Sequence, residues 1–226
     1  MVGGRDLGLW ARPRLNPATI HARFSALEGA SQIATRFAAE HLAWWLKRQR
    51  PQVVCEVGSG IGTLSAVILD TVSSWTTVWA VEPDAWCWEQ WRRNLGAAGA
   101  RVLHATASVP TRQQVDFLVL DGGDKRPDYY TNLARRALVF VEGNRRPQRA
   151  VLEAELTLRR RSYACAQWKP SDRSKGVWIV LTAPRLWERM WFAAVRVREA
   201  ILDLMAWALG CPVGKRRPQR PAGLTA

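Results

Sequence analysis

Side chains that bind metals are scarce in this chain of 226 residues. It has three histidines and four cysteines, Cys55, Cys87, Cys165 and Cys211, and the cysteines lack the short spacing of a zinc site. Cys55 and Cys165 fall in apolar stretches typical of strands, which predicts buried thiols. That cysteine usage favours a reducing cytoplasm over a disulfide-rich secreted protein.

Long apolar runs are also missing, since no stretch approaches the length of about eighteen uncharged residues that a membrane-spanning helix needs. The first six residues lack the apolar core of a secretory signal. The length suits one main domain with a sizeable core. We therefore expect a cytoplasmic protein, with contact at a membrane surface as the one open alternative.

Acidic residues are few, with 19 Asp and Glu against 33 Lys and Arg, for a net charge of +14. The imbalance is uneven, because residues 51–110 carry three basic and five acidic residues. Positive charge outside this stretch suits an anionic partner, while the stretch itself suits a cationic cofactor. A basic surface without a specific partner is the other interpretation.

The most informative segment reads Val53-Val54-Cys55-Glu56-Val57-Gly58-Ser59-Gly60-Ile61-Gly62-Thr63. It predicts a buried strand, a glycine turn and then a helix. Glycine has no Cβ, so this backbone can take positive φ and lie against a ligand. The dinucleotide fingerprint places its third glycine one residue later, at Thr63. The pattern indicates a nucleotide-type cofactor site, with an ordinary glycine-rich turn as the alternative.

Acids end two further predicted strands. Glu82 follows the apolar residues 76–81 and lies 24 residues after Gly58, where an acid binds ribose hydroxyls in a βαβ unit. A carboxylate accepts two hydrogen bonds from a cis-diol, although a solvated strand-end acid is also possible. A third strand is predicted at 101–104, and residues 115–121 read as a fourth strand that ends in Asp121.

Residues 53–121 resemble the class I S-adenosylmethionine (SAM) methyltransferases, whose motif I has the form E-x-G-x-G-x-G. The resemblance implies an α/β fold with a Rossmann-like, seven-stranded sheet and helices on both faces. It also implies that SAM is held by Glu56, Gly58, Ser59, Gly60, Gly62, Glu82 and Asp121.

The remaining elements are predicted from periodicity and turn residues. Residues 20–47 read as a helix, and 127–137 as a helix before a strand at 138–142. The resemblance to small-molecule O-methyltransferases implies that the first of these helices caps an acceptor pocket. A helix at 145–161 precedes an antiparallel strand pair at 162–168 and 176–182. The expected organisation is an N-terminal loop and cap helix at 1–50, a SAM-binding domain at 51–184 and an amphipathic helix with a basic tail at 185–226.

Residues 120–130 resemble the fourth-strand region of the catechol and caffeoyl-CoA O-methyltransferases. The resemblance implies Asp121 and Lys125 in catalysis, and a Mg²⁺ ion that Asp121, Glu142 and Asn144 would bind. Two departures favour metal independence. Lys125 follows Asp121 by four residues rather than three, and Glu142-Gly143-Asn144 replaces an Asp-Asn pair. An exposed turn before a helix is the competing interpretation of Lys125.

The function implied is SAM-dependent methylation of a small-molecule acceptor, at oxygen. Arg145, Arg146 and Arg149 would clamp a carboxylate or phosphate on that acceptor, unless they only begin a solvated helix. The basic charge also permits an RNA methyltransferase. Residues 121–124 lack the acid or Asn, two prolines and aromatic typical of enzymes that methylate base amines, which makes nucleic acid the weaker hypothesis. A non-catalytic SAM-binding protein is the third.

Residues 185–209 predict a long amphipathic helix. A helical wheel gathers its charges in one narrow stripe and leaves a wide apolar face that something must cover; the stripe holds Arg185, Glu188, Arg189, Arg196, Glu199 and Asp203. A basic segment follows at 215–220. We expect the cover to be the parent domain or a second subunit of a homodimer, with a peripheral membrane contact through residues 185–220 as the further possibility.

Overall fold

A computed structural model describes residues 15–105, 114–122, 128–143, 145–172 and 175–209. Seven strands form one sheet of order β3-β2-β1-β4-β5-β7-β6. They are β1 (Val53–Val57), β2 (Thr77–Val81), β3 (Val102–Ala105), β4 (Val115–Leu120), β5 (Leu133–Glu142), β6 (Tyr163–Trp168) and β7 (Val177–Thr182). The strands β1 to β5 pair in parallel, and β7 runs antiparallel to both β5 and β6. The predicted seven-stranded α/β sheet with a final antiparallel pair is confirmed.

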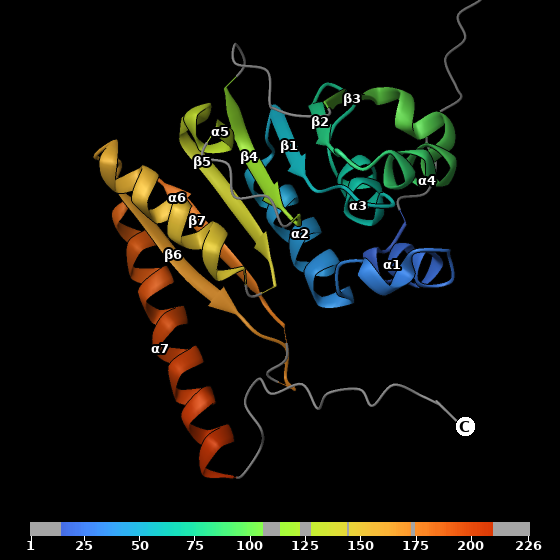
Figure 1. The fold of residues 1–226 in the computed structure, drawn as a ribbon. Helices are drawn as coiled ribbons and strands as arrows, with labels where there is room; N and C mark the ends of the chain where they lie inside the picture. The colour runs from blue at the N-terminus through green and yellow to red at the C-terminus, as the bar shows by residue number, and fades with distance from the viewer. Residues whose placement is uncertain (1–14, 106–113, 123–127, 144, 173–174, 210–226) are drawn as a thin grey trace, which may run out of the picture.

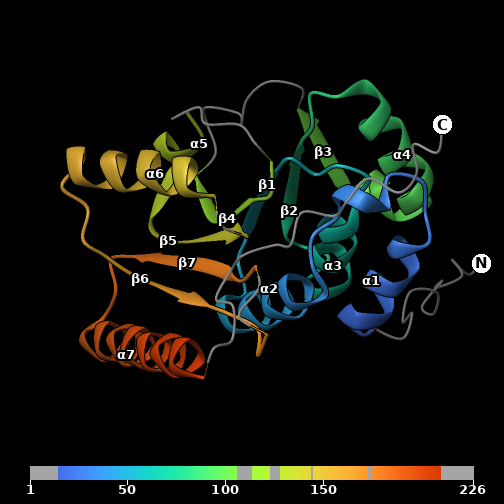
Figure 2. The same ribbon diagram turned by 60° about the horizontal axis from the view of Figure 1, so that its bottom comes forward.

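Helices cover both faces of the sheet, each over its own apolar core (Figures 1 and 2). One face carries α1 (Pro17–Ser25), α2 (Arg36–Gln49), α3 (Thr63–Thr71), α4 (Ala85–Leu95) and α7 (Leu186–Ala208). The other carries α5 (Asp128–Thr131) and α6 (Arg146–Leu158). Two 3₁₀ turns, η1 (Ala30–Gln32) and η2 (Gly96–Arg101), complete the described elements.

The central strands explain why the sheet forms at these residues. Every residue of β1 is buried, as expected for a parallel strand covered on both faces.

Cys55 is a fully buried thiol, as predicted, whereas Cys165 in the edge strand β6 is only half-buried, which corrects that prediction. Because β1 and β4 are neighbours whose connections leave in opposite directions, their carboxyl ends form the crevice where sheets of this kind bind ligands.

The N-terminal region forms two helices where the sequence predicted one over 20–47. Helix α1 ends at Ser25, and α2 begins at Arg36 after the 3₁₀ turn η1. Gly29 has φ +84°, a left-handed conformation that interrupts the helix. The Thr35 hydroxyl then accepts a hydrogen bond from the Ala38 N–H at 3.1 Å and starts α2.

The predicted helix over 127–137 is wrong beyond its first turn. Only Asp128–Thr131 is helical, and the chain is already extended at Leu133, where β5 begins. Leu133 pairs with Val115 and is buried, together with Ala134, in the core beneath α5 and α6. Burial against neighbouring elements thus overrides the local helical pattern.

Helix α7 packs along β6 on its own sheet, and Phe192 and Val195 are buried there. The charged stripe of the helical wheel does not face solvent as a whole, because Glu188 and Glu199 point inward and are only 5% and 6% exposed. The acids of the helix are paired with cations, and Glu199 lies 3.8 Å from Arg198 of α7 itself. Arg136 of β5 donates to both Glu188 carboxylate oxygens, one at 3.0 Å, and Lys169 lies 2.5 Å from the Asp203 carboxylate. Within the described ranges, no helix is long and apolar enough to cross a bilayer.

Candidate functional site

The glycine turn between β1 and α3 takes the backbone conformations that its sequence predicts. Gly58, Gly60 and Gly62 have φ of +79°, +52° and +98°, a region that other residues rarely adopt. A Cβ on Gly58 would lie 2.2 Å from the Gly122 Cα, so the two turns touch through backbone. A Cβ on Gly60 would meet no described atom within 4 Å, because this part of the turn faces a cavity.

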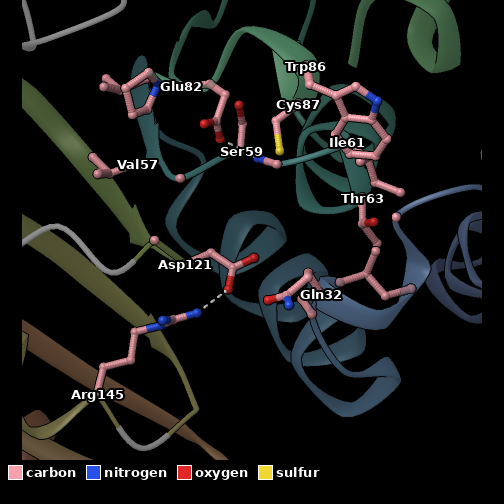
Figure 3. A pocket seen from close by; sticks show the side chains of 18 residues that line it. Gln32, Val57, Ser59, Ile61, Thr63, Glu82, Trp86, Cys87, Asp121 and Arg145 are labelled. Carbon is pink, nitrogen blue, oxygen red and sulfur yellow. Dashed lines mark hydrogen bonds and ion pairs between the residues drawn. The ribbon is translucent and has the colours of Figure 1, made fainter. Parts of the chain in front are cut away.

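That cavity has a volume of about 480 Å³ and lies at the carboxyl ends of β1, β2 and β4 (Figure 3). Its polar wall holds Ser59, Thr63, Glu82, Asp121 and Arg145. Gln32, Cys87 and apolar side chains, among them Ile33, Ile61 and Trp86, line the remainder. Residues of the connection between α1 and α2 line it as well, so part of the predicted cap segment does reach the site.

Glu82 has its carboxylate held in place by backbone donors. The Gly60 N–H donates to Oε2 at 2.7 Å, and the Asp84 N–H donates to Oε1 at 3.0 Å. The side chain is buried and lines the cavity, while both oxygens keep a further lone pair. The geometry therefore offers a fixed hydrogen-bond acceptor at the cavity wall.

Two buried hydroxyl groups in the wall lack partners among the described residues, namely Ser59 Oγ and Thr63 Oγ1. Leaving such a group unsatisfied costs about 1–3 kcal/mol, so native proteins seldom do it without a reason. Both residues line the cavity. A polar ligand in the cavity would satisfy them.

Asp121 follows β4 and faces a guanidinium. Arg145 donates to Asp121 Oδ1 at 2.8 Å and to Glu142 Oε2 at 3.4 Å, so it lies between the two carboxylates. Burial, followed by the Glu142 charge, raises the pKa of Asp121 to about 7, although the Arg145 charge acts in the opposite direction. Asp121 therefore changes protonation near neutral pH.

The residues implied for a Mg²⁺ ion fit it poorly. Asp121 and Glu142 already share the Arg145 guanidinium, which takes the position of a cation between them. No group of three His, Cys, Asp or Glu side chains that suits a metal exists among the described residues. Asn144 and Lys125, the other residues implied for metal binding and catalysis, lie outside the described residues.

Glu56 lies beneath the glycine turn rather than in the cavity wall. Its carboxylate accepts a hydrogen bond from Ser65 of α3, and Trp91 Nε1 donates to that same hydroxyl at 2.7 Å. Burial raises the pKa of Glu56 to about 8. Its place, tying β1 to α3 and α4, indicates support for the turn. Gly62 likewise lies outside the wall and is the N-cap residue of α3.

The three arginines after β5 do not converge on one point. Only Arg145 lines the cavity. The Arg149 guanidinium lies 4.4 Å from the centre of the Trp178 ring, and Arg146 is exposed. Sequence reasoning missed Gln32, Ile61, Thr63 and Trp86 as wall residues. No signal along the chain marks Gln32 and Trp86, because the fold brings them together from separate segments (Figure 3).

Comparison with solved structures gives consistent neighbours. An O-methyltransferase from Bacillus cereus, solved with S-adenosylhomocysteine (SAH), matches with a TM-score of 0.59 and 12% identity over 74% of this chain and 91% of that one. A methyltransferase from Geobacter sulfurreducens matches with a TM-score of 0.56 and 22% identity over 77% and 93%. This chain has a class I methyltransferase fold.

The same fold carries more than one reaction. A precorrin-6y C5,15-methyltransferase from Geobacter metallireducens matches with a TM-score of 0.54 and 14% identity over 73% of this chain and 95% of that one. No protein-family model matches the sequence, and no curated protein matches it. At sequence identities of 12–22%, the likeness to methyltransferases establishes the fold alone. The function has to be inferred from the side chains of the site.

Proposed function

We propose that this protein is a SAM-dependent methyltransferase that acts on a small-molecule acceptor, at oxygen. The observation that carries the proposal is the composition of one cavity wall. It combines a glycine turn open to the cavity at Gly60, the oriented carboxylate of Glu82, and the unpartnered hydroxyls of Ser59 and Thr63. The Bacillus cereus neighbour, solved with SAH, adds support for this cofactor.

Each group in the wall has a role that matches a part of SAM. Glu82 would accept hydrogen bonds from the two ribose hydroxyls, as acids at the end of the second strand do. The apolar side chains of Ile61 and Trp86 would contact the adenine ring. Asp121, when ionised, would attract the positive sulfonium. The acids Glu82 and Asp121 on the cavity wall would thus face a cationic ligand.

Asp121 is the residue on the cavity wall best suited to hold the acceptor's proton. When bound, SAM supplies a methyl group that the acceptor oxygen takes as the carbon–sulfur bond breaks, which leaves SAH. The hydroxyl proton passes to the Asp121 carboxylate, whose pKa of about 7 is near the value that general-base catalysis favours. Arg145, 2.8 Å away, keeps that carboxylate in position.

The position of Arg145 also affects whether the reaction needs a metal ion and which charge the acceptor carries. Because its guanidinium already lies between Asp121 and Glu142, we propose turnover that does not need Mg²⁺. EDTA should then leave the rate unchanged. We also propose that the acceptor is anionic. Of the three arginines after β5, only Arg145 lines the cavity and could bind such a group, because the Arg149 guanidinium lies over the Trp178 ring.

Calorimetry with SAM, SAH and NAD tests the cofactor. The wild type should bind SAM and SAH but not NAD, and Glu82→Ala should bind SAM at least tenfold more weakly because it loses the charged acceptor of two hydrogen bonds. Glu89→Ala is the matched control, an exposed acid on α4 that pairs with Arg93 and does not line the cavity. NAD binding without SAM binding would contradict the proposal. SAM binding without turnover on any hydroxyl acceptor would instead leave a non-catalytic binding protein.

A further inference from the structure

Helix α7 exposes its apolar side to solvent. Seven side chains on this side are each more than half exposed: Leu186, Met190, Val197, Ile201, Leu204, Met205 and Trp207. We call this set the outer face of α7. Successive residues of a helix are about 100° apart, which places most of these side chains along one line. No described residue covers them, although contiguous apolar surface of this kind usually marks an interaction site.

The charges around the outer face are of one sign. The exposed Arg189 and Arg196 border it on one side, and the exposed Arg198 borders it on the other. The helix's two glutamates, Glu188 and Glu199, are buried on the opposite side. Asp203 is partly buried and paired with Lys169. The outer face therefore presents apolar side chains between arginines, with no exposed acid beside them on the described helix.

The same surface continues onto helix α2. The Arg48 guanidinium lies 5.5 Å from the Trp44 ring centre, 5.7 Å from that of Trp187 and 6.0 Å from that of Trp191, so it joins the two helices. Trp44 and Trp187 are about half exposed, and Lys47 beside them is exposed. Figure 2 shows α2 and α7 in one layer over the sheet. Tryptophan and long cationic side chains are suited to the boundary between lipid headgroups and acyl chains.

We propose that α7 binds an anionic membrane surface, lying in the plane of the interface with its outer face in the lipid. The apolar line enters the headgroup boundary while the arginines on both borders reach the phosphates. In sequence the chain continues from α7 into Lys215-Arg216-Arg217-Pro218-Gln219-Arg220, which adds charge of the same sign. This surface is separate from the cofactor cavity, and the proposal does not rest on the methyltransferase activity.

A second copy of the chain suits the outer face less well. A symmetric contact would bring the Arg189, Arg196 and Arg198 of one copy against the same set of the other. Glu188 is bound to Arg136, and Glu199 lies 3.8 Å from Arg198 of its own copy, so both glutamates are buried and face no arginine of a second copy. An anionic lipid surface supplies the missing negative charge, and this complementarity decides between the two partners.

Sedimentation of the full chain with lipid vesicles tests the proposal. The protein should bind phosphatidylcholine vesicles that contain phosphatidylglycerol much better than pure phosphatidylcholine, and high salt should weaken that binding. The double variant Ile201→Asp, Leu204→Asp should bind at least about tenfold more weakly, since two apolar side chains become charged. The thermal midpoint should stay unchanged because both side chains are exposed.

Leu158→Asp is the matched control, because Leu158 is 77% exposed on α6 over the other face of the sheet. It should bind vesicles as the wild type does. The paired change Arg196→Gln, Arg198→Gln should reduce the preference for anionic over neutral vesicles. Equal vesicle binding by the wild type and the double Asp variant would overturn the proposal and assign any binding to the basic tail. A different result would be a wild type that binds no vesicles and forms a dimer, with the double Asp variant monomeric. That result would assign the outer face to a second copy.

Discussion

Removal of the Arg145 guanidinium tests whether it, and not a metal ion, neutralises the two acids of the site. Arg145→Met keeps a long apolar side chain but leaves the carboxylates of Asp121 and Glu142 facing each other, with 14% and 4% of their side chains exposed. Breaking a buried ion pair by removing one partner costs about 3–5 kcal/mol. Because Arg145 is 26% exposed, we expect the low end, about 3 kcal/mol.

The loss should be measurable as a fall in the thermal midpoint. For a domain of this size, 1 kcal/mol corresponds to roughly 2–4 °C, so Arg145→Met should melt about 6–12 °C below the wild type. The control is Arg146→Met, an exposed neighbour at the start of the same helix, which should change the midpoint little. Differential scanning calorimetry without divalent ions gives both values.

The deficit should depend on pH in a defined direction. Without the opposing Arg145 charge, the pKa of Asp121 rises further above its raised value of about 7. An acid with a raised folded-state pKa binds a proton more tightly in the folded state, so folding stability falls as pH rises from the unfolded pKa towards the folded one. The gap between Arg145→Met and the wild type should therefore be larger at pH 8 than at pH 5.

A second change separates electrostatics from packing. Adding Asp121→Asn to Arg145→Met removes one unpaired carboxylate, so part of the lost stability should return. If Arg145→Met and Arg146→Met have the same thermal midpoint at every pH, the Arg145 guanidinium does not neutralise these acids and the reasoning fails. Recovery of the single variant by Mg²⁺ but not by Na⁺ would show that a cation does bind between the carboxylates once the guanidinium is gone.

Two further predictions follow from the glycine turn and its support. Gly58→Ala should abolish SAM binding and lower the thermal midpoint by several degrees, because its Cβ would lie 2.2 Å from the Gly122 Cα. The control is Gly96→Ala, which has φ +50° but no described atom within 4 Å of its Cβ, so it should cost only the strain of positive φ. Equal losses of thermal midpoint in the two variants would contradict the clash. Glu56→Gln should grow more stable relative to the wild type as pH rises from 6 to 9, because wild-type stability falls as pH rises towards the folded-state pKa of about 8. Parallel midpoint curves for the two proteins would show that Glu56 is not protonated in the fold.

The cofactor half of the site was predictable because its chemistry is local. The turn at Gly58 and Gly60 needs positive φ, and that requirement is written in consecutive residues. Glu82 is further away, but one helix separates it from the turn, so the length of a βαβ unit fixes the spacing. The structure places Gly58, Gly60 and Glu82 together on the wall of one cavity, with the Glu82 carboxylate 2.7 Å from the Gly60 N.

The opposite wall was not predictable, because it comes from segments that meet only in the folded chain. Gln32 belongs to a 3₁₀ turn between two N-terminal helices, and Trp86 to the first turn of α4. Neither has a motif. Arg145 was recognised as a basic residue beside the site, but its partners Asp121 and Glu142 end two different strands. Only the pairing of β4 with β5 shows that the guanidinium lies between them.

Helix α7 shows the limit of a helical wheel, which groups residues on faces without saying which face is inward. The usual rule turns the apolar face to the core and the charges to water. Here Arg136 of β5 binds Glu188 through both oxygens, and Lys169 beside β6 binds Asp203, so the acids find compensating charge inside. Once those pairs orient the helix, Phe192 and Val195 still fill the core, but Met190, Ile201 and Leu204 must face outward. The exposed apolar line thus lies opposite a buried side that holds both Glu188 and Glu199, an arrangement that the pattern of the helix alone does not predict.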